Sequence, residues 1–166
     1  MYNKKILLCS IGFILIFTFA ISSNAFAGEK RNFSAHLSGS SQIPAAVDTL
    51  AHGKAKFKLS KNKQYIHYRL SAANIENVIM AHIHMASEDA NGPVVAWLFP
   101  ATPPPITVEG RFDGVLAAGV ITSTTLTGPL AGQTLQDLIN AMSAGNTYVN
   151  VHTIQNGAGE IRGQIR

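Results

Sequence analysis

Three histidines have the residue type and the spacing to bind a metal ion. His82 and His84 lie two positions apart in an apolar segment, so on a β-strand both side chains leave the same face. His152 follows Val149 and Val151, which an alternating strand turns inward. We therefore expect all three imidazoles on the outer faces of their strands. If the two strands are neighbours, the three rings can ligate one ion and leave a position open for water or substrate.

Imidazole ligands suit several transition metals, and we expect copper first and zinc second. Met85 offers a soft sulfur ligand for Cu(I), although alternation turns it inward. Asn150 and Glu160 are candidates for groups that support the ligands from behind. An H-x-H pair is also common on exposed strands, so the alternative is that these are ordinary surface residues. The other histidines have no partner at a suitable spacing and are interpreted as surface or hydrogen-bonded residues: His36, His52 and His67.

Other chemistries have little support in the chain. It contains no G-x-S-x-G nucleophile motif and no glycine-rich phosphate loop followed by Lys-Ser/Thr. Five lysines between Lys54 and Lys63 form the main charge cluster, but no aromatic residue is interleaved on their face. Nucleic-acid binding is therefore not expected. We interpret the lysines as the solvated, aggregation-resistant edge of a hairpin.

Alternating apolar residues predict that the histidines lie on β-strands. Lysines alternate with apolar residues over Lys54–Leu59, a Lys61–Lys63 turn follows, and Ile66–Leu70 forms the return strand of a hairpin. A separate strand covers Ile79–His84, with Ile79, Ala81 and Ile83 in the core. Further strands are expected at the positions Phe33–Ser38, Val94–Phe99, Thr107–Val108, Gly119–Thr122, Tyr148–Thr153 and Glu160–Ile165.

One helix interrupts the strands near the C-terminus. Thr134 can cap its start with Asp137 in the capping-box position, and Gly145 supplies its end. An apolar stripe at helical spacing consists of Leu135, Leu138, Ile139 and Met142. Many short strands with one late helix predict an all-β fold, a sandwich or a barrel.

The first 27 residues predict export. Lys4 and Lys5 precede the apolar run Ile6–Ile21, and Ala25–Ala27 forms a small-x-small cleavage site. We expect a signal peptide over residues 1–27, one mature domain over residues 28–166, and a secreted or periplasmic protein with no membrane span after cleavage. The lone cysteine leaves with the signal, and the net charge of +4 falls to +2 when the two lysines are removed.

Three blocks of sequence occur in order along the mature chain: LSGSSQIPA (37–45), AHIH followed by NGPVVAWLF (81–99), and YVNVHT followed by GEIRGQI (148–165). In these blocks the mature chain resembles the CHRD family, the module named for its repeats in chordin. MASEDA (85–90) departs from the glycine-richer segment of the family. This resemblance implies an extracellular module with a protein or cell-surface partner.

The order of elements is also similar to copper-zinc superoxide dismutase, in which an H-x-H strand and a later V-H strand carry copper ligands. His82 and His84 match the first pair and His152 the later ligand. This resemblance implies a Greek-key β-sandwich or barrel of the immunoglobulin-like or superoxide-dismutase-like kind. Between His84 and His152 there is no further histidine, so the bridging histidine and the zinc loop have no counterpart. We expect a metal-binding module rather than an enzyme. The alternatives are a non-catalytic interaction module without metal and, third, a redox enzyme acting on superoxide.

Overall fold

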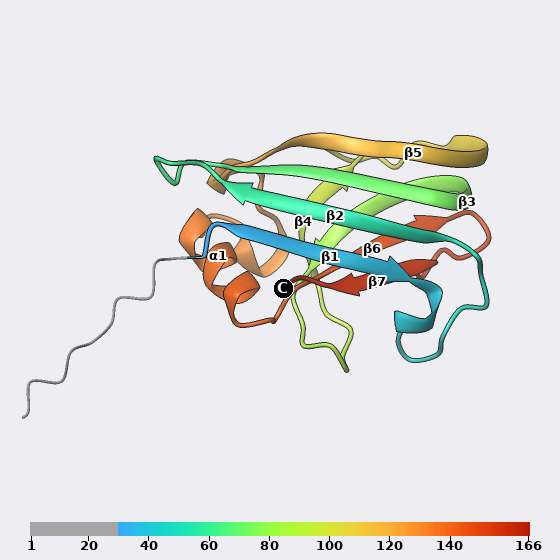
Figure 1. Cartoon of the computed structure of the whole chain (residues 1–166). Helices are drawn as coiled ribbons and strands as arrows, with labels where there is room; N and C mark the ends of the chain where they lie inside the picture. Colours follow the sequence, from blue (N-terminus) through green and yellow to red (C-terminus); the bar gives the residue numbers. More distant parts are fainter. Residues whose placement is uncertain (1–29) are drawn as a thin grey trace, which may run out of the picture.

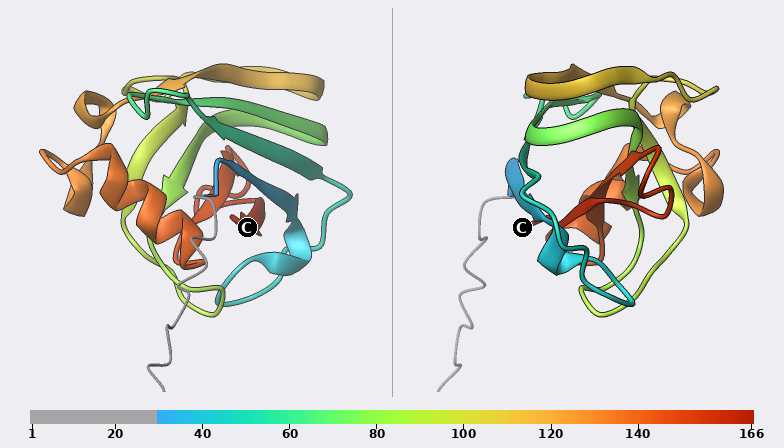
Figure 2. Two further views of the ribbon diagram at one scale, coloured as in Figure 1. Left: turned by 60° about the vertical axis from the view of Figure 1, so that its left-hand side comes forward. Right: turned by 90° about the vertical axis from the view of Figure 1, so that its right-hand side faces the viewer.

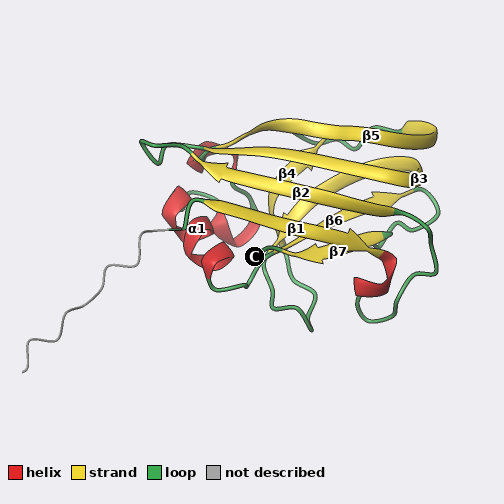
Figure 3. Cartoon of the chain, viewed as in Figure 1, coloured by secondary structure: helices red, strands yellow, loops and turns green. Residues whose placement is uncertain are grey.

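The computed structural model describes residues 30–166, which form a mostly β structure with a single short α-helix (Figures 1 and 3). In chain order the strands are β1 (Asn32–Ser38), β2 (His52–Leu59), β3 (Ile66–His84), β4 (Val94–Phe99), β5 (Val108–Ile121), β6 (Tyr148–Thr153) and β7 (Ile161–Gln164). The helices are α1 (Leu135–Ser143) and the 3-10 turns η1 (Gly39–Ser41), η2 (Ser123–Thr125) and η3 (Gly128–Leu130). Within residues 30–166, no helix is long and apolar enough to cross a bilayer. The predicted signal peptide, residues 1–27, lies outside the described residues.

Five of the strands close into a barrel, which Figure 2 shows from further directions. The ring runs β1–β2–β3–β6–β7, each pair antiparallel. It closes where β7 returns to β1, at the pair Ser38–Arg162 and through backbone hydrogen bonds between Ser34 and Arg166. The remaining strands β4 and β5 both pair with β3. The predicted all-β class is confirmed, and its form is a closed barrel with two added strands.

Strand β3 joins the parts of the fold, because its 19 residues pair with four other strands. We predicted two short strands here, and that prediction is wrong. Asn74 and Asn77 have φ angles of 53° and 52°, a left-handed conformation that asparagine tolerates better than most residues. The ladder with β5 shifts register around both positions. These irregularities break the period-2 pattern while the strand itself continues.

One of these shifts also moves a predicted core residue. Ile79 is only partly buried, and Val78 is fully buried in its place. The ladder between β3 and β6 changes register between Val78 and Met80. Beyond the shift, Ala81 and Ile83 are fully buried as predicted. The register of the histidine segment therefore stands.

Strand β5 is likewise one long strand where the sequence predicted two short ones. Gly110 and Gly114 have positive φ angles of 74° and 151°. Most side chains between them are exposed, so no alternation marks the segment as a strand. Its continuity comes from pairing with β3, which a local pattern does not reveal.

The lysine-bearing hairpin forms as predicted, with one correction. Ala55, Phe57 and Leu59 are buried, and the return strand begins at Ile66 after a turn in which Lys63 adopts a φ of 58°. However, β2 pairs along its whole length with β1 on one side and with β3 on the other. It is not an edge strand, and the interpretation of its lysines as edge protection is wrong.

The helix is confirmed in its bounds and in the side it buries. Thr134 and Asp137 form a reciprocal capping box, and Gly145 follows the end with a φ of 70°. The predicted apolar stripe is buried: Leu135, Leu138, Ile139 and Met142. These side chains belong to the same core as the barrel interior, and α1 lies at one end of the strands (Figure 1).

Candidate metal centre

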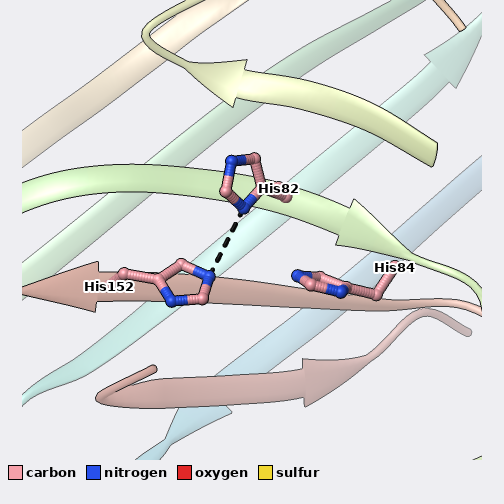
Figure 4. Close-up of side chains that lie close together, drawn as sticks. All are labelled: His82, His84 and His152. Atoms are coloured by element: carbon pink, nitrogen blue, oxygen red, sulfur yellow. Dashed lines mark hydrogen bonds between the residues drawn. The ribbon is translucent and has the colours of Figure 1, made fainter. Parts of the chain in front are cut away.

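The three predicted histidines lie together on adjacent strands. His82 and His84 come from the end of β3 and His152 from β6, and the two strands are directly paired, with Met80 opposite His152 and His82 opposite Asn150. One nitrogen from each ring lies within 4.8 Å of the others. Figure 4 shows the three rings gathered in one place from two strands. The neighbourhood assumed from the sequence is therefore present.

Two of the rings are oriented by backbone carbonyls. His84 donates its Nδ1 hydrogen to the carbonyl of Gly92 at 2.8 Å, and His152 donates its Nδ1 hydrogen to Gly157 at 3.0 Å. A neutral imidazole that donates through one nitrogen has a lone pair on the other. Both rings therefore present an Nε2 lone pair, the arrangement that commonly fixes a metal-binding histidine.

The third ring has a different orientation. Nδ1 of His82 lies 3.4 Å from Nε2 of His152, while Nε2 of His82 points away from the other two rings (Figure 4). Nε2 of His82 and Nε2 of His84 are both buried without a hydrogen-bond partner. Buried polar atoms without a partner are rare, and an ion bound among the three rings would give a partner to Nε2 of His84 but not to Nε2 of His82. Without a metal, the tautomer that satisfies Nε2 of His152 has the hydrogen of His82 on Nδ1.

The predicted exposure of these histidines is wrong, although their face is right. His82 is 3% exposed and His152 is 6% exposed. They point away from the barrel core, but loops cover that face. Gln42 reaches it by donating to Asn150 at 2.8 Å, and residues 85–93 and 154–159 supply the Gly92 and Gly157 carbonyls. The histidines therefore lie between the sheet and its loops, with His82 and His152 buried and His84 partly buried.

This burial keeps the imidazoles neutral. Removal from water, together with the nearby His152 and His84, lowers the pKa of His82 from 6.5 to about 3. Burial also lowers the pKa of His84 and of His152, against the opposing effect of the carbonyls that accept their hydrogens. Neutral imidazole is the form that ligates a metal ion, so the site is in its binding form well below neutral pH.

Aromatic rings and a buried arginine enclose the site, and the sequence did not indicate them. The Trp97 ring on β4 lies edge-on to His82 with a centroid distance of 4.2 Å. The Tyr148 ring stacks on the His84 ring with a centroid distance of 4.8 Å. The guanidinium carbon of Arg162 lies 3.6 Å from the centroid of the same Tyr148 ring. The sequence did contain one indication for Tyr148, because it lies an even number of positions from His152 on one strand and so is on the same face.

Arg162 ties the 85–93 loop to the sheet. It is 1% exposed, and it donates to the side-chain oxygen of Asn91 and to the carbonyls of Ser87, Glu88 and Ala90. The same loop carries Gly92, which orients His84. Arg162 therefore holds one wall of the histidine site without contacting a possible ligand atom.

The two residues predicted to support the ligands act through the loops. Asn150 is buried, accepts from Gln42 and donates to the Ala158 carbonyl at 3.3 Å. Glu160 is buried and accepts from Thr49, Thr153 and Asn156. Both hold the 154–159 turn whose Gly157 carbonyl orients His152. Neither has a hydrogen bond to an imidazole.

The remaining histidines lie elsewhere, as the sequence indicated. His36, His52 and His67 are exposed on the first three strands, and they are not part of the histidine cluster. Met85 is partly buried against the core and follows the cluster in the chain. The site as described consists of His82, His84 and His152 alone.

The chain belongs to a known family of domains. The family model of the CHRD domain matches residues 33–165, so the chain belongs to the CHRD family. Membership in this family suggests an extracellular or periplasmic module. No curated protein and no solved structure matches the chain. The similarity to copper-zinc superoxide dismutase therefore stays a prediction from motif order.

Proposed function

We propose that this protein is an extracytoplasmic CHRD module that binds one metal ion, copper before zinc, through His82, His84 and His152. The observation that carries the proposal is the convergence of three imidazole nitrogens within 4.8 Å of one another, from two buried and one partly buried side chain. Two of the rings already have the tautomer that leaves Nε2 available.

The donor set fits the proposed ion. Three neutral nitrogens and no thiolate suit Cu(II) and Zn(II), and for a given nitrogen site copper binds more tightly. The rings are held by carbonyls, a stacked tyrosine and an edge-on tryptophan, so little side-chain entropy remains to be lost on binding. An ion bound there would also give the unpaired Nε2 of His84 a partner. His82 would bind through Nδ1, with its hydrogen on Nε2.

The burial of the histidines suits a site that binds an ion better than it suits a site that catalyses a reaction. Loops cover the histidine face, and His82 and His152 have almost no exposed surface. A catalytic site needs an open coordination position that substrate can reach. A protected site of this kind suits storage, delivery or structural use of copper, so the protein is proposed to be a non-enzymatic module.

The chain contains one tryptophan, and it reports directly on the site. Trp97 lies 4.2 Å from the His82 ring, so paramagnetic Cu(II) bound there should quench its fluorescence strongly. Zn(II) has a filled d shell and should compete for the site without quenching. Titration of purified protein with Cu(II) at neutral pH, followed by competition with Zn(II), measures both affinities.

Matched variants identify the ligands. Replacing His82, His84 or His152 singly with alanine should weaken copper binding at least tenfold, the order of effect expected when a ligand or its direct support is lost. His36→Ala and His67→Ala should bind like the parent, because both side chains are exposed on other strands. If all five variants bind copper alike, or the parent binds no copper, the proposed metal site is refuted and the alternative function, an interaction module without metal, replaces it.

The predicted signal peptide completes the proposal. A signal peptide over residues 1–27 and a mature domain over residues 28–166 would deliver the module to the periplasm or the medium. A site of neutral imidazoles without thiols suits an oxidising compartment, because it has no cysteine to oxidise. Fractionation of cells that express the full chain, followed by detection of the protein, tests the location.

A further inference from the structure

A second surface, which does not include the three clustered histidines, carries a concentration of positive charge. Lys54, Lys56 and Lys58 project from the outer face of β2, and Arg69 projects from the same face of β3. Arg69 is paired directly with Lys56 in the ladder. We call these four residues the basic face. The three lysines span about 13 Å, because alternate residues of a strand lie about 6.6 Å apart.

The structure does not neutralise this charge. Within residues 30–166, none of the four cations has an ion pair with a carboxylate, whereas Arg111 pairs with Asp113 and Arg166 with Glu88. Like charges directly opposite one another in a sheet are destabilising, so the Lys56–Arg69 pair lowers the stability of the fold. An external anion would remove that repulsion.

Protection of a sheet edge does not account for the lysines. Edge strands often have lysines because they block pairing with another chain. Strand β2, however, has its hydrogen bonds satisfied on both sides by β1 and β3. Its lysines have no edge to protect, and a positive face on an internal strand needs another reason.

The basic face lines a shallow groove with polar groups beside the cations. The groove has a volume of about 440 Å³ and runs across β1, β2 and β3. Asn32 and Ser34 on β1 lie opposite Lys58 and Lys56 and add an amide and a hydroxyl to the lining. Such groups can bind uncharged hydroxyls between the anionic groups of a polymer.

We propose that the basic face binds a linear acidic polysaccharide. Charge complementarity selects a polyanion, and the repeat of lysines along one strand suits a linear one. No large hydrophobic side chain of β1, β2 or β3 is exposed, and on the adjoining β5 only the small side chains of Val115 and Val120 are, so the face offers little apolar area to a lipid bilayer. Its aromatic residues Phe33, Phe57 and Tyr68 are buried, which removes the stacking that single-stranded nucleic acid uses.

The test is binding of a size-defined polyuronate by calorimetry at low and at physiological salt. Dextran of the same length is the uncharged control, and single-stranded DNA and vesicles with anionic lipids are the competing polyanions. The double variant Lys56→Gln/Arg69→Gln removes two exposed ion pairs with the polymer and should weaken polyuronate binding roughly 2- to 30-fold. Arg111→Gln/Arg166→Gln changes the net charge equally outside the basic face and should bind within about twofold of the parent.

The outcomes separate the proposal from its competitors. Salt-sensitive binding of polyuronate but not dextran, weakened only by the basic-face variant, supports it. Equal weakening by both double variants, or no polyuronate binding by the parent, overturns it. Tighter binding of DNA or of vesicles overturns the choice of polysaccharide. Quenching of Trp97 by Cu(II) should be unchanged in the basic-face variant, so failure here is distinguishable from failure of the metal site.

Discussion

Arg162→Met tests whether the buried guanidinium holds the wall of the histidine site. Methionine keeps most of the length of the arginine stem but removes every donor. Four hydrogen bonds disappear, to the side chain of Asn91 and to the carbonyls of residues 87, 88 and 90, at distances from 2.7 to 3.3 Å. The guanidinium that lies 3.6 Å from the centroid of the Tyr148 ring is replaced by an uncharged thioether, so the cation–π contact is lost.

The expected loss follows from these contacts. Hydrogen bonds from a charged group contribute about 1.5–3 kcal/mol each, and a desolvated cation–π contact contributes about 2 kcal/mol. Two effects offset most of this sum. The cost of burying the guanidinium disappears, and the exposed loop residues 87–91 can turn their carbonyls to water. We expect a net loss of about 2–3 kcal/mol in the free energy of unfolding.

Urea unfolding of the metal-free protein measures this loss, with Arg111→Met as the matched control. Arg111 has a side chain 63% exposed and an ion pair with Asp113, so its replacement should cost under about 1 kcal/mol. Copper titration of the Arg162 variant adds a second readout. A looser 85–93 loop releases the Gly92 carbonyl from His84, so copper affinity should fall while the three ligands remain present.

Two results would refute this reasoning. If Arg162→Met and Arg111→Met lose equal stability, the buried arginine does not hold the loop. If Arg162→Met loses stability as expected but binds copper like the parent, the loop is anchored by Arg162 without orienting His84.

Four further expectations follow from the structure. Ile83→Ala should lower the free energy of unfolding by about 2–5 kcal/mol and His84→Ala by less in metal-free protein, and the reverse order in urea unfolding would mean that the strand register is shifted by one. Acidification from about pH 6.5 to 3 should lower the free energy of unfolding, because His82 takes up a proton in the unfolded chain but not in the folded protein. In urea unfolding at a series of pH values, His82→Gln should make this pH dependence less steep. An equally steep dependence in the variant and the parent would contradict this explanation. Copper-loaded protein should dismutate superoxide far below about 10⁸ M⁻¹s⁻¹, since no bridging histidine lies between His84 and His152, and a stopped-flow rate near that ceiling would restore the enzyme reading. N-terminal sequencing of exported protein should begin at Gly28, and an uncleaved N-terminus would disprove the signal peptide.

Features set by local chemistry could be predicted from the sequence. The helix was identified because its capping box, apolar stripe and terminal glycine are all encoded within twelve residues of Thr134. The lysine hairpin was identified because its side chains alternate over a full strand. The pairing of His82 with the later His152 strand came from motif order and is confirmed as adjacency of β3 and β6.

Features set by distant parts of the chain could not be predicted. Alternation gives the face on which His152 lies, but only the folded loops decide whether that face meets water. The partners of the buried Arg162 lie 71 to 75 residues away in the chain, and nothing near it in the sequence marks it as buried. Strand continuity through Asn74 and Asn77 was hidden for the same reason, because pairing with β5 maintains it.

The closure of the barrel by the first and last strands determines when the protein can fold. Strand β1 (Asn32–Ser38) is the first strand of residues 30–166, and its partner at the seam, β7 (Ile161–Gln164), is the last. Contacts between strands so distant in sequence form late and slowly in folding. The three histidines are therefore brought together late, because His152 lies on the penultimate strand, β6. If the protein is exported as proposed and is still unfolded at that point, the compartment in which it folds would decide which ion the proposed site receives.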